Sequence, residues 1–106
     1  MIHIESGYEK GKYTLSAVGH ANTAPDGEDL VCAAASILVQ TAAQILRQAQ
    51  KENKATGGCC YMEKGDTVLT AYELSGETLL QLEGIEEGFL LLAKDFPQAV
   101  CFQKKR

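Results

Sequence analysis

Residues 29–51 read DLVCAAASILVQTAAQILRQAQK, and this stretch contains neither glycine nor proline. The absence of both helix-breaking residues predicts one long helix. Asp29 is a preferred N-cap residue, and Glu28 and Asp29 together suit the positive end of a helix dipole. From Leu30 to Val39 the segment is apolar nearly all round, which indicates a helix buried on more than one side. Other elements of the fold must therefore cover this helix.

The sequence before this helix predicts a strand hairpin. In residues 2–8, Ile2 and Ile4 lie on one side of an extended chain and their polar neighbours on the other. Residues 12–19 form a second strand-like run, and a turn near Gly11 joins the two runs.

The sequence after the helix predicts a second hairpin and a second helix. Residues 56–58 are expected to end the long helix, and the runs 59–63 and 67–73 are strand-like. The second helix is expected from Ser75 to about Phe96, because Pro97 stops it. Its apolar residues recur at steps of three and four, which is typical of a core-facing stripe: Leu82, Ile85, Phe89, Leu92 and Phe96.

The end of the chain completes the pattern. Gly84 and Gly88 lie four apart inside the second helix, which indicates close packing there. Residues 99–102 fit a final strand, and residues 104–106 are expected to form a frayed tail. The order ββαββαβ predicts a single α+β domain over residues 1–106. In this domain a mainly antiparallel sheet is covered on one face by both helices, in two layers.

Composition excludes several classes of protein. Among 106 residues, 45% are apolar and 23% are charged, which is typical of a folded globular chain and not of a disordered one. The net charge of −4 argues against direct nucleic-acid binding. No apolar run reaches the roughly 18 residues of a membrane span, and the start lacks the pattern of a secretory signal. We therefore expect a cytoplasmic protein that does not bind membranes.

The four cysteines are expected to be reduced thiols, because cytoplasmic proteins rarely keep structural disulfides. They are Cys32, Cys59, Cys60 and Cys101. No Cys-x-x-Cys motif occurs and only two histidines are present, so the spacing of a zinc site is missing. No metal is expected, and the last three cysteines are expected to pack in or beside the sheet.

Two residues with reactive side chains are predicted next to the ends of secondary-structure elements. His20 follows a predicted strand, and Cys32 is the third residue of the long helix if Asp29 is its N-cap. Backbone N–H groups and the helix dipole at that end favour a thiolate, and a nearby imidazole would complete an activated nucleophile. The alternative also stays open: Cys32 is a structural cysteine in an apolar run, and His20 is a surface residue.

The two residues belong to a longer pattern. Gly19-His20-Ala21 is followed by Gly27-x-Asp29-x-Val31-Cys32-Ala33-Ala34-x-Ser36. This pattern, with twelve positions from His20 to Cys32, resembles the signature of the ribosomal-processing cysteine protease family, Prp. The order of elements and the chain length resemble that family as well, so the resemblance spans essentially the whole chain.

The resemblance implies a function and a set of site residues. It implies a homodimeric cysteine endopeptidase that removes an N-terminal extension peptide from a protein of the bacterial large ribosomal subunit, without a cofactor. His20 and Cys32 would form its catalytic dyad. The supporting or substrate-binding residues would be those at the other motif positions: Gly19, Ala21, Gly27, Asp29 and Ser36.

The chain departs from the family pattern at a few positions. Asn22 and Thr23 replace a frequent Gly-Tyr pair, and Ala35 replaces a frequent Val or Ile. The first change falls in residues 21–28, for which we expect a mobile lid over the substrate cleft, so it concerns peptide specificity.

Several roles stay open between function and structure. Asp29 either orients the dyad or only caps the helix, and Asp26 is an alternative partner for His20. Ser36 either bonds near the thiol or bonds back to its own helix. The alternative to a protease is a non-catalytic ribosome-associated or ribosome-assembly protein that has kept the fold.

Overall fold

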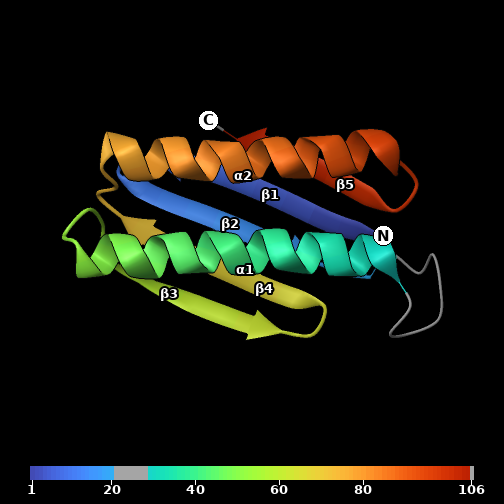
Figure 1. Cartoon of the computed structure of the whole chain (residues 1–106), viewed down its shortest axis with the longest axis horizontal. Helices are drawn as coiled ribbons and strands as arrows, with labels where there is room; N and C mark the ends of the chain where they lie inside the picture. The colour runs from blue at the N-terminus through green and yellow to red at the C-terminus, as the bar shows by residue number, and fades with distance from the viewer. Residues whose placement is uncertain (21–28, 106) are drawn as a thin grey trace.

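The computed structural model describes residues 1–20 and 29–105. Two hairpins, two helices and a last strand follow one another along the chain (Figure 1). Their bounds are β1 Ile2–Glu9, β2 Lys12–Val18, α1 Leu30–Lys51, β3 Thr56–Glu63, β4 Asp66–Tyr72, α2 Gly76–Asp95 and β5 Val100–Lys105. The predicted order ββαββαβ is confirmed.

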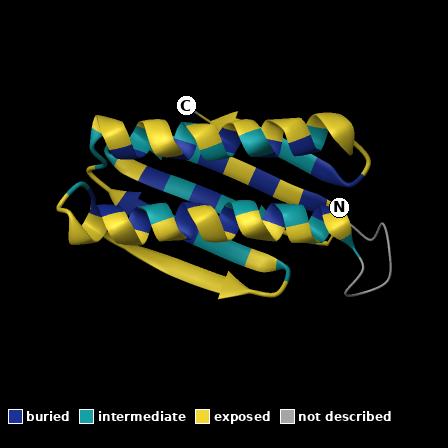
Figure 2. Ribbon diagram, in the orientation of Figure 1, coloured by how far each residue is buried: buried dark blue, intermediate teal, exposed yellow. Residues whose placement is uncertain are grey.

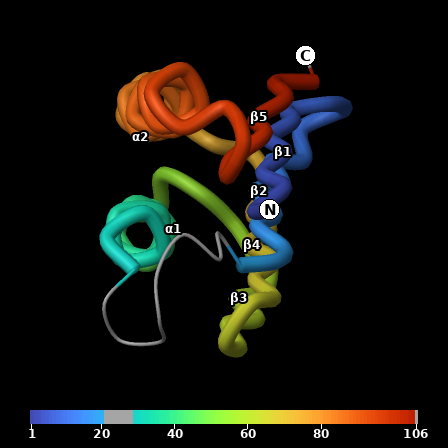
Figure 3. The backbone as a smooth tube through the Cα atoms, turned by 90° about the vertical axis from the view of Figure 1, so that its right-hand side faces the viewer, coloured from blue at the N-terminus to red at the C-terminus, as the bar shows by residue number. Residues whose placement is uncertain are grey.

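The five strands form one sheet in the order β3-β4-β2-β1-β5. The pairs β1–β2, β2–β4 and β3–β4 are antiparallel, whereas β5 pairs in parallel with β1. Both helices lie on the same side of this sheet (Figure 3). The predicted two-layer α+β fold with a mainly antiparallel sheet is therefore confirmed.

The core lies between the sheet and the two helices (Figure 2). Alternation along the strands turns Ile2 and Ile4 of β1 inward, together with Tyr13 and Leu15 of β2. The helices contribute their inner faces, on which Phe89 is fully buried. The Phe89 and Phe102 rings have centroids 5.9 Å apart, a distance typical of aromatic pairs.

Two chain segments differ from the prediction. The long helix ends at Lys51 as its predicted span does, but residues 56–58 belong to the next strand: Thr56 begins β3, with a register shift between Thr56 and Cys59. Positive φ angles at Gly57 and Gly58 allow this bulge. The predicted frayed tail is also wrong for Lys104 and Lys105, because pairing with β1 extends β5 through both residues.

The core stripe of α2 differs from its prediction at its edges. Leu82, Phe89 and Leu92 are buried as predicted, but Phe96 is 44% exposed because the helix ends before it. Glu86 is buried instead, and the Tyr13 hydroxyl donates a hydrogen bond to its carboxylate at 3.0 Å. A buried carboxylate needs such partners, and hydrophobic periodicity does not reveal them.

The two helical glycines play different roles. Gly88 packs against α1, and a Cβ atom placed on it would lie 2.8 Å from Leu38 Cδ2. Gly84 has no atom within 4 Å of such a Cβ. Close packing is therefore confirmed for Gly88 and wrong for Gly84.

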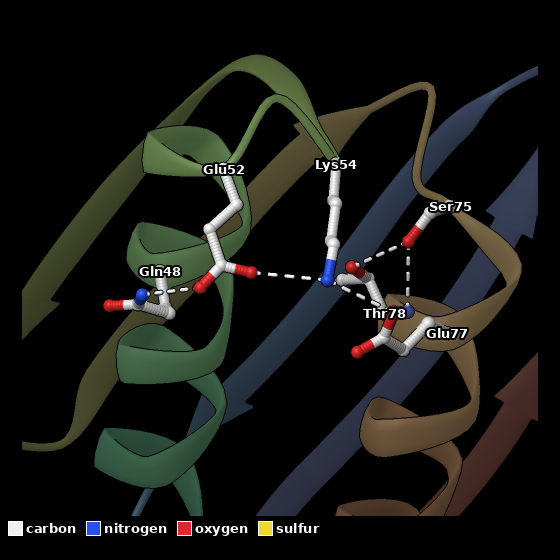
Figure 4. A network of polar contacts seen from close by, with 6 residues as sticks. All are labelled: Gln48, Glu52, Lys54, Ser75, Glu77 and Thr78. Carbon is white, nitrogen blue, oxygen red and sulfur yellow. Dashed lines mark hydrogen bonds and ion pairs between the residues drawn. The ribbon is translucent and has the colours of Figure 1, made fainter.

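Polar contacts join the end of α1 to the start of α2 (Figure 4). Lys54 forms ion pairs with Glu52 at 3.1 Å and with Glu77 at 3.0 Å, and Ser75 caps α2 by accepting from the Thr78 N–H. The hydrogen bond from Gln48 and the charge of Lys54 lower the pKa of Glu52, and Glu77 raises the pKa of Lys54. These pairs are exposed, so each stabilises the fold little.

Within the described residues, α1 is the one helix long and apolar enough to span a bilayer by length and composition. Core helices of soluble proteins share this property. In this fold α1 buries one face against the sheet, from Val31 to Ala49.

Candidate active site

An open cavity of about 550 Å³ lies beside the first half of α1. Four segments line it: Ile2 at the start of β1, the end of β2 with Gly19 and His20, the first half of α1 with its cap, and the turn between β3 and β4. From α1 the lining includes Cys32, Ser36 and Gln40. The two residues on which the predicted chemistry depends therefore share one cavity.

Asp29 caps α1, as the sequence predicts. Its carboxylate oxygen Oδ1 accepts hydrogen bonds from the backbone N–H groups of Val31 at 3.0 Å and Cys32 at 3.1 Å. The cap fixes the backbone of the first turn, and Cys32 lies half-buried in that turn. The N-terminal end of the helix dipole thus lies beside the thiol.

Three backbone N–H groups at the start of the helix already have acceptors. Such groups are candidate donors to the oxyanion that develops when a carbonyl is attacked. The N–H groups of Val31 and Cys32 already bind Asp29 Oδ1, and the Ala33 N–H binds the Asp29 carbonyl at 3.1 Å. Oxyanion donors from these three residues would require the cap to break.

One face of α1 carries a row of side chains into the cavity. Cys32, Ser36 and Gln40 lie four residues apart, so successive members lie on one helix face. The Gln40 side-chain amide donates to Ser36 Oγ at 3.0 Å. The sequence offered two partners for the Ser36 hydroxyl, a group near the thiol or a carbonyl of its own helix. The structure shows a different partner, the Gln40 side chain one turn further along the helix.

His20 lies two positions after the last residue of β2 and is exposed. Its imidazole lies against Gly65 in the β3–β4 turn. The preceding residue, Gly19, has φ +109° and lies against the Met1 carbonyl group, where a side chain would collide. Its N–H donates to the Gly65 carbonyl at 2.9 Å. Gly19 thus allows β2 to end close to β1 and to the β3–β4 turn.

The structure brings together five of the predicted site residues, all of them lining the cavity: Gly19, His20, Asp29, Cys32 and Ser36. Ala21 and Gly27 lie outside the described residues, as do Asn22, Thr23, Asp26 and the expected lid over residues 21–28.

Sequence reasoning missed the whole contribution of the second hairpin. Residues 62–67, including Glu63, Gly65 and Asp66, line the cavity beside His20. They are more than forty positions from His20 in the sequence. Only the sheet order, with β4 next to β2, brings them to the site. Gln40 was missed too, although its spacing of four from Ser36 was visible in the sequence.

The other cysteines lie away from this cavity. Cys59 and Cys60 are exposed on β3, and Cys101 is half-buried on β5. None of the four cysteines, all of which the structure describes, forms a disulfide, and the described part of the chain holds no cluster of three or more metal-binding side chains.

Fold and site together are those of a two-layer α+β protein that holds a cysteine and a histidine on one open cavity. A cysteine and a histidine are the two side chains on which cysteine hydrolases depend, a class in which a thiol is the nucleophile.

The chain belongs to the cysteine protease Prp family, whose model matches residues 1–99. Membership makes the chain a cysteine protease and confirms the resemblance in the sequence motifs. A comparison with curated protein sequences gives no match.

Solved structures share the fold at low sequence identity. The essential ribosomal processing protease Prp from S. aureus, in complex with a covalently linked product peptide, has a TM-score of 0.80 at 18% identity. The same protease with a substrate peptide has a TM-score of 0.75 at 17% identity. In both cases the match covers 99% of this chain and 100% of the other. SMU.848 from Streptococcus mutans has a TM-score of 0.65 at 21% identity, and the match covers 100% of this chain and 96% of that one.

Proposed function

We propose that this cysteine protease removes the N-terminal extension of a bacterial large-subunit ribosomal protein. The family supplies the reaction class. The S. aureus relative, a ribosomal processing protease seen with substrate and product peptides, supports the substrate class. The observation that carries the proposal for this chain is that His20 and Cys32 line one open cavity, with Cys32 in the first turn of a capped helix.

In the proposed mechanism Cys32 is the nucleophile and His20 the general base. Cys32 Sγ attacks the scissile carbonyl carbon, and His20 takes the thiol proton. The tetrahedral intermediate collapses, the C–N bond breaks, and the imidazolium returns the proton to the leaving amine. A water molecule then attacks the thioester, His20 takes its proton, and the thiol is restored as the acid product leaves. This cycle needs no cofactor.

The remaining cavity residues support this dyad in the proposal. Asp29 holds the backbone of Cys32, and Gly19 holds the chain just before His20. The Ser36 oxygen accepts from Gln40, so the Ser36 hydroxyl still has its own hydrogen to donate. We assign Ser36 to hold the substrate backbone one helical turn beyond Cys32.

Charge at the cavity fits a basic substrate chain. Glu63 and Asp66 are exposed at the cavity wall, where they outnumber the exposed Lys64 that lies between them in the sequence, and the whole chain has a net charge of −4. Ribosomal proteins that contact RNA are rich in Lys and Arg, and opposite charges raise the rate of encounter. A protein substrate, with no direct nucleic-acid binding, agrees with this charge.

Cleavage of a ribosomal protein tests the proposal directly. The purified protease is incubated with the extended ribosomal protein of its own organism, and the intact mass of that protein is measured. We expect a loss equal to the N-terminal extension, and none for a substrate already lacking it. An unchanged mass would overturn the proposal and favour a non-catalytic ribosome-associated role.

We also propose that the protease acts in the cytoplasm as a homodimer. Large apolar side chains remain on the outer faces of both helices, where a partner would cover them: Leu30, Ile37, Leu80 and Leu91. Sedimentation at micromolar concentration is expected to give twice the chain mass of 11.4 kDa. A single species of chain mass would contradict the dimer and leave the protease assignment intact.

The order in which the cysteines are alkylated shows whether Cys32 is chemically activated, because its solvent exposure alone would not make it the fastest thiol. Cys59 and Cys60 are exposed, whereas Cys32 is half-buried. Exposure alone therefore predicts faster alkylation of Cys59 and Cys60. Because Cys32 lies in the first turn of a capped helix and shares its cavity with His20, we expect Cys32 to react first with iodoacetamide near neutral pH. Peptide mapping of a time course measures the order, and preferential labelling of the β3 cysteines would count against an activated Cys32.

A further inference from the structure

The β3–β4 turn carries a glycine whose Cα faces the His20 ring. A Cβ atom placed on Gly65 would lie 2.5 Å from His20 Nε2 and 2.8 Å from Cε1. Contacts below about 3 Å are closer than such atoms tolerate. The imidazole therefore occupies the space that any side chain at position 65 would take.

A backbone hydrogen bond joins the two segments that make this contact. Gly19, directly before His20, donates its N–H to the Gly65 carbonyl at 2.9 Å. Gly19 is itself confined, because its Cα lies against the Met1 carbonyl group. The chain leading into His20 and the surface under its ring thus belong to the same turn.

The orientation of an exposed histidine ring at a strand end depends on the neighbouring atoms that it contacts. His20 follows Val18, the last residue of β2, by two positions and is solvent-exposed. An exposed ring has several rotamers of similar energy unless a neighbour selects one. Because Gly65 has no side chain, the His20 ring can lie close to the turn. There it forms part of the wall of the cavity that Cys32 also lines.

We propose that Gly65 is a positioning residue for the His20 imidazole, and that the β3–β4 turn is therefore a functional part of the site. This inference rests on the proposed function, since it assigns to Gly65 an effect that acts through His20. Two separable features favour glycine at position 65: its φ of +77°, and the space under the ring, from which a Cβ atom would displace the imidazole.

Gly65→Asn separates these two reasons. Asparagine tolerates a positive φ but carries a Cβ atom. Gly11 provides a matched control, because it lies in the β1–β2 turn with φ +78° and has nothing within 4 Å of a built Cβ. Its carbonyl also accepts one backbone N–H from a neighbouring segment, that of Glu73 at 2.8 Å. Gly11→Asn therefore repeats the backbone change without the contact to an imidazole.

We expect Gly65→Asn to lower kcat about 100-fold, the usual order for a displacement of about 1 Å in a catalytic group. KM should change little, and the pH dependence of kcat/KM should shift, because the base no longer lies in its place. Gly11→Asn should stay within about twofold of the parent with an unchanged pH profile. Equal kinetics and pH profiles for Gly65→Asn and the parent would overturn the inference.

Nuclear magnetic resonance of the histidines gives a readout that does not depend on cleavage. The chain has two histidines, His3 and His20, and a His3→Gln variant assigns their ring signals. His3 is exposed on β1 and serves as the internal reference. In Gly65→Asn the His20 signal should move while the His3 signal stays. An unmoved His20 signal would contradict the contact, whether or not the protein cleaves ribosomal substrates.

A double-mutant cycle covers the case in which Gly65→Asn folds poorly. If the collision with the ring causes the loss of stability, His20→Ala should remove most of it, and the two changes should not add. Additive losses would show that Gly65 acts through the backbone alone and would overturn the positioning role. Loss of cleavage in His20→Ala by itself tests only the dyad, so the two failures remain distinguishable.

Discussion

Cys32→Ala is expected to abolish cleavage of the extended ribosomal protein, with a loss of at least about 10⁴-fold in kcat. Removing the nucleophile of a covalent mechanism leaves only the effects of binding, and losses of this order are usual in such enzymes. The fold should survive, because Cys32 is only half-buried and alanine is a strong helix former. Intact-mass assays measure the loss, and circular dichroism confirms the folded state.

Cys60→Ala is the matched control for this change. Cys60 is a free thiol on β3, and its Sγ lies 3.9 Å from Arg47 Nη1, outside the cavity that Cys32 lines. Its loss should leave cleavage within about twofold of the parent. A folded Cys32→Ala protein that still cleaves at a substantial rate would refute the thiol mechanism.

Phe89→Ala is expected to give the largest loss of stability, about 3–5 kcal/mol in the free energy of unfolding. Phe89 is 0% exposed and joins the inner face of α2 to the sheet through the Phe102 ring. Its truncation leaves a cavity that rigid neighbours cannot close. For a domain of this size, the melting temperature should fall by roughly 12 °C or more.

Leu80→Ala provides the comparison on the same helix. Leu80 is 70% exposed on the outer face of α2, so its truncation should change the stability of the monomer by about 0.5 kcal/mol at most. Because Leu80 is also one of the side chains that a partner copy would cover, urea unfolding of both variants is measured at a concentration at which sedimentation gives the monomer. Similar losses for Phe89→Ala and Leu80→Ala would contradict the assignment of the inner and outer faces of α2.

Local signals in the sequence predicted most of the elements. Both helices and both hairpins follow from apolar spacing and from turn residues such as Gly11 and Gly65. The Asp29 cap followed from residue type alone, and the structure confirms it. These features depend on neighbours a few positions apart, which a single sequence displays directly.

Long-range placement could not be predicted in the same way. No local pattern shows that β4 lies beside β2, and this pairing brings the β3–β4 turn to His20. The buried Glu86 was missed for the same reason, because its partner Tyr13 is 73 positions away. Motif spacing predicted His20 and Cys32 as the candidate dyad, whereas no local pattern predicted the surface under the His20 ring.

The bulge at the start of β3 has a consequence for how copies of this chain behave in concentrated solution. β3 is an edge strand of the sheet, and all eight of its residues are exposed (Figure 2). A long, straight edge of this kind invites strand pairing between molecules and therefore aggregation. The bulge at Gly57 and Gly58 bends the edge and interrupts its row of hydrogen-bonding groups. Two glycines far from the proposed chemistry thus help to keep the protease dispersed.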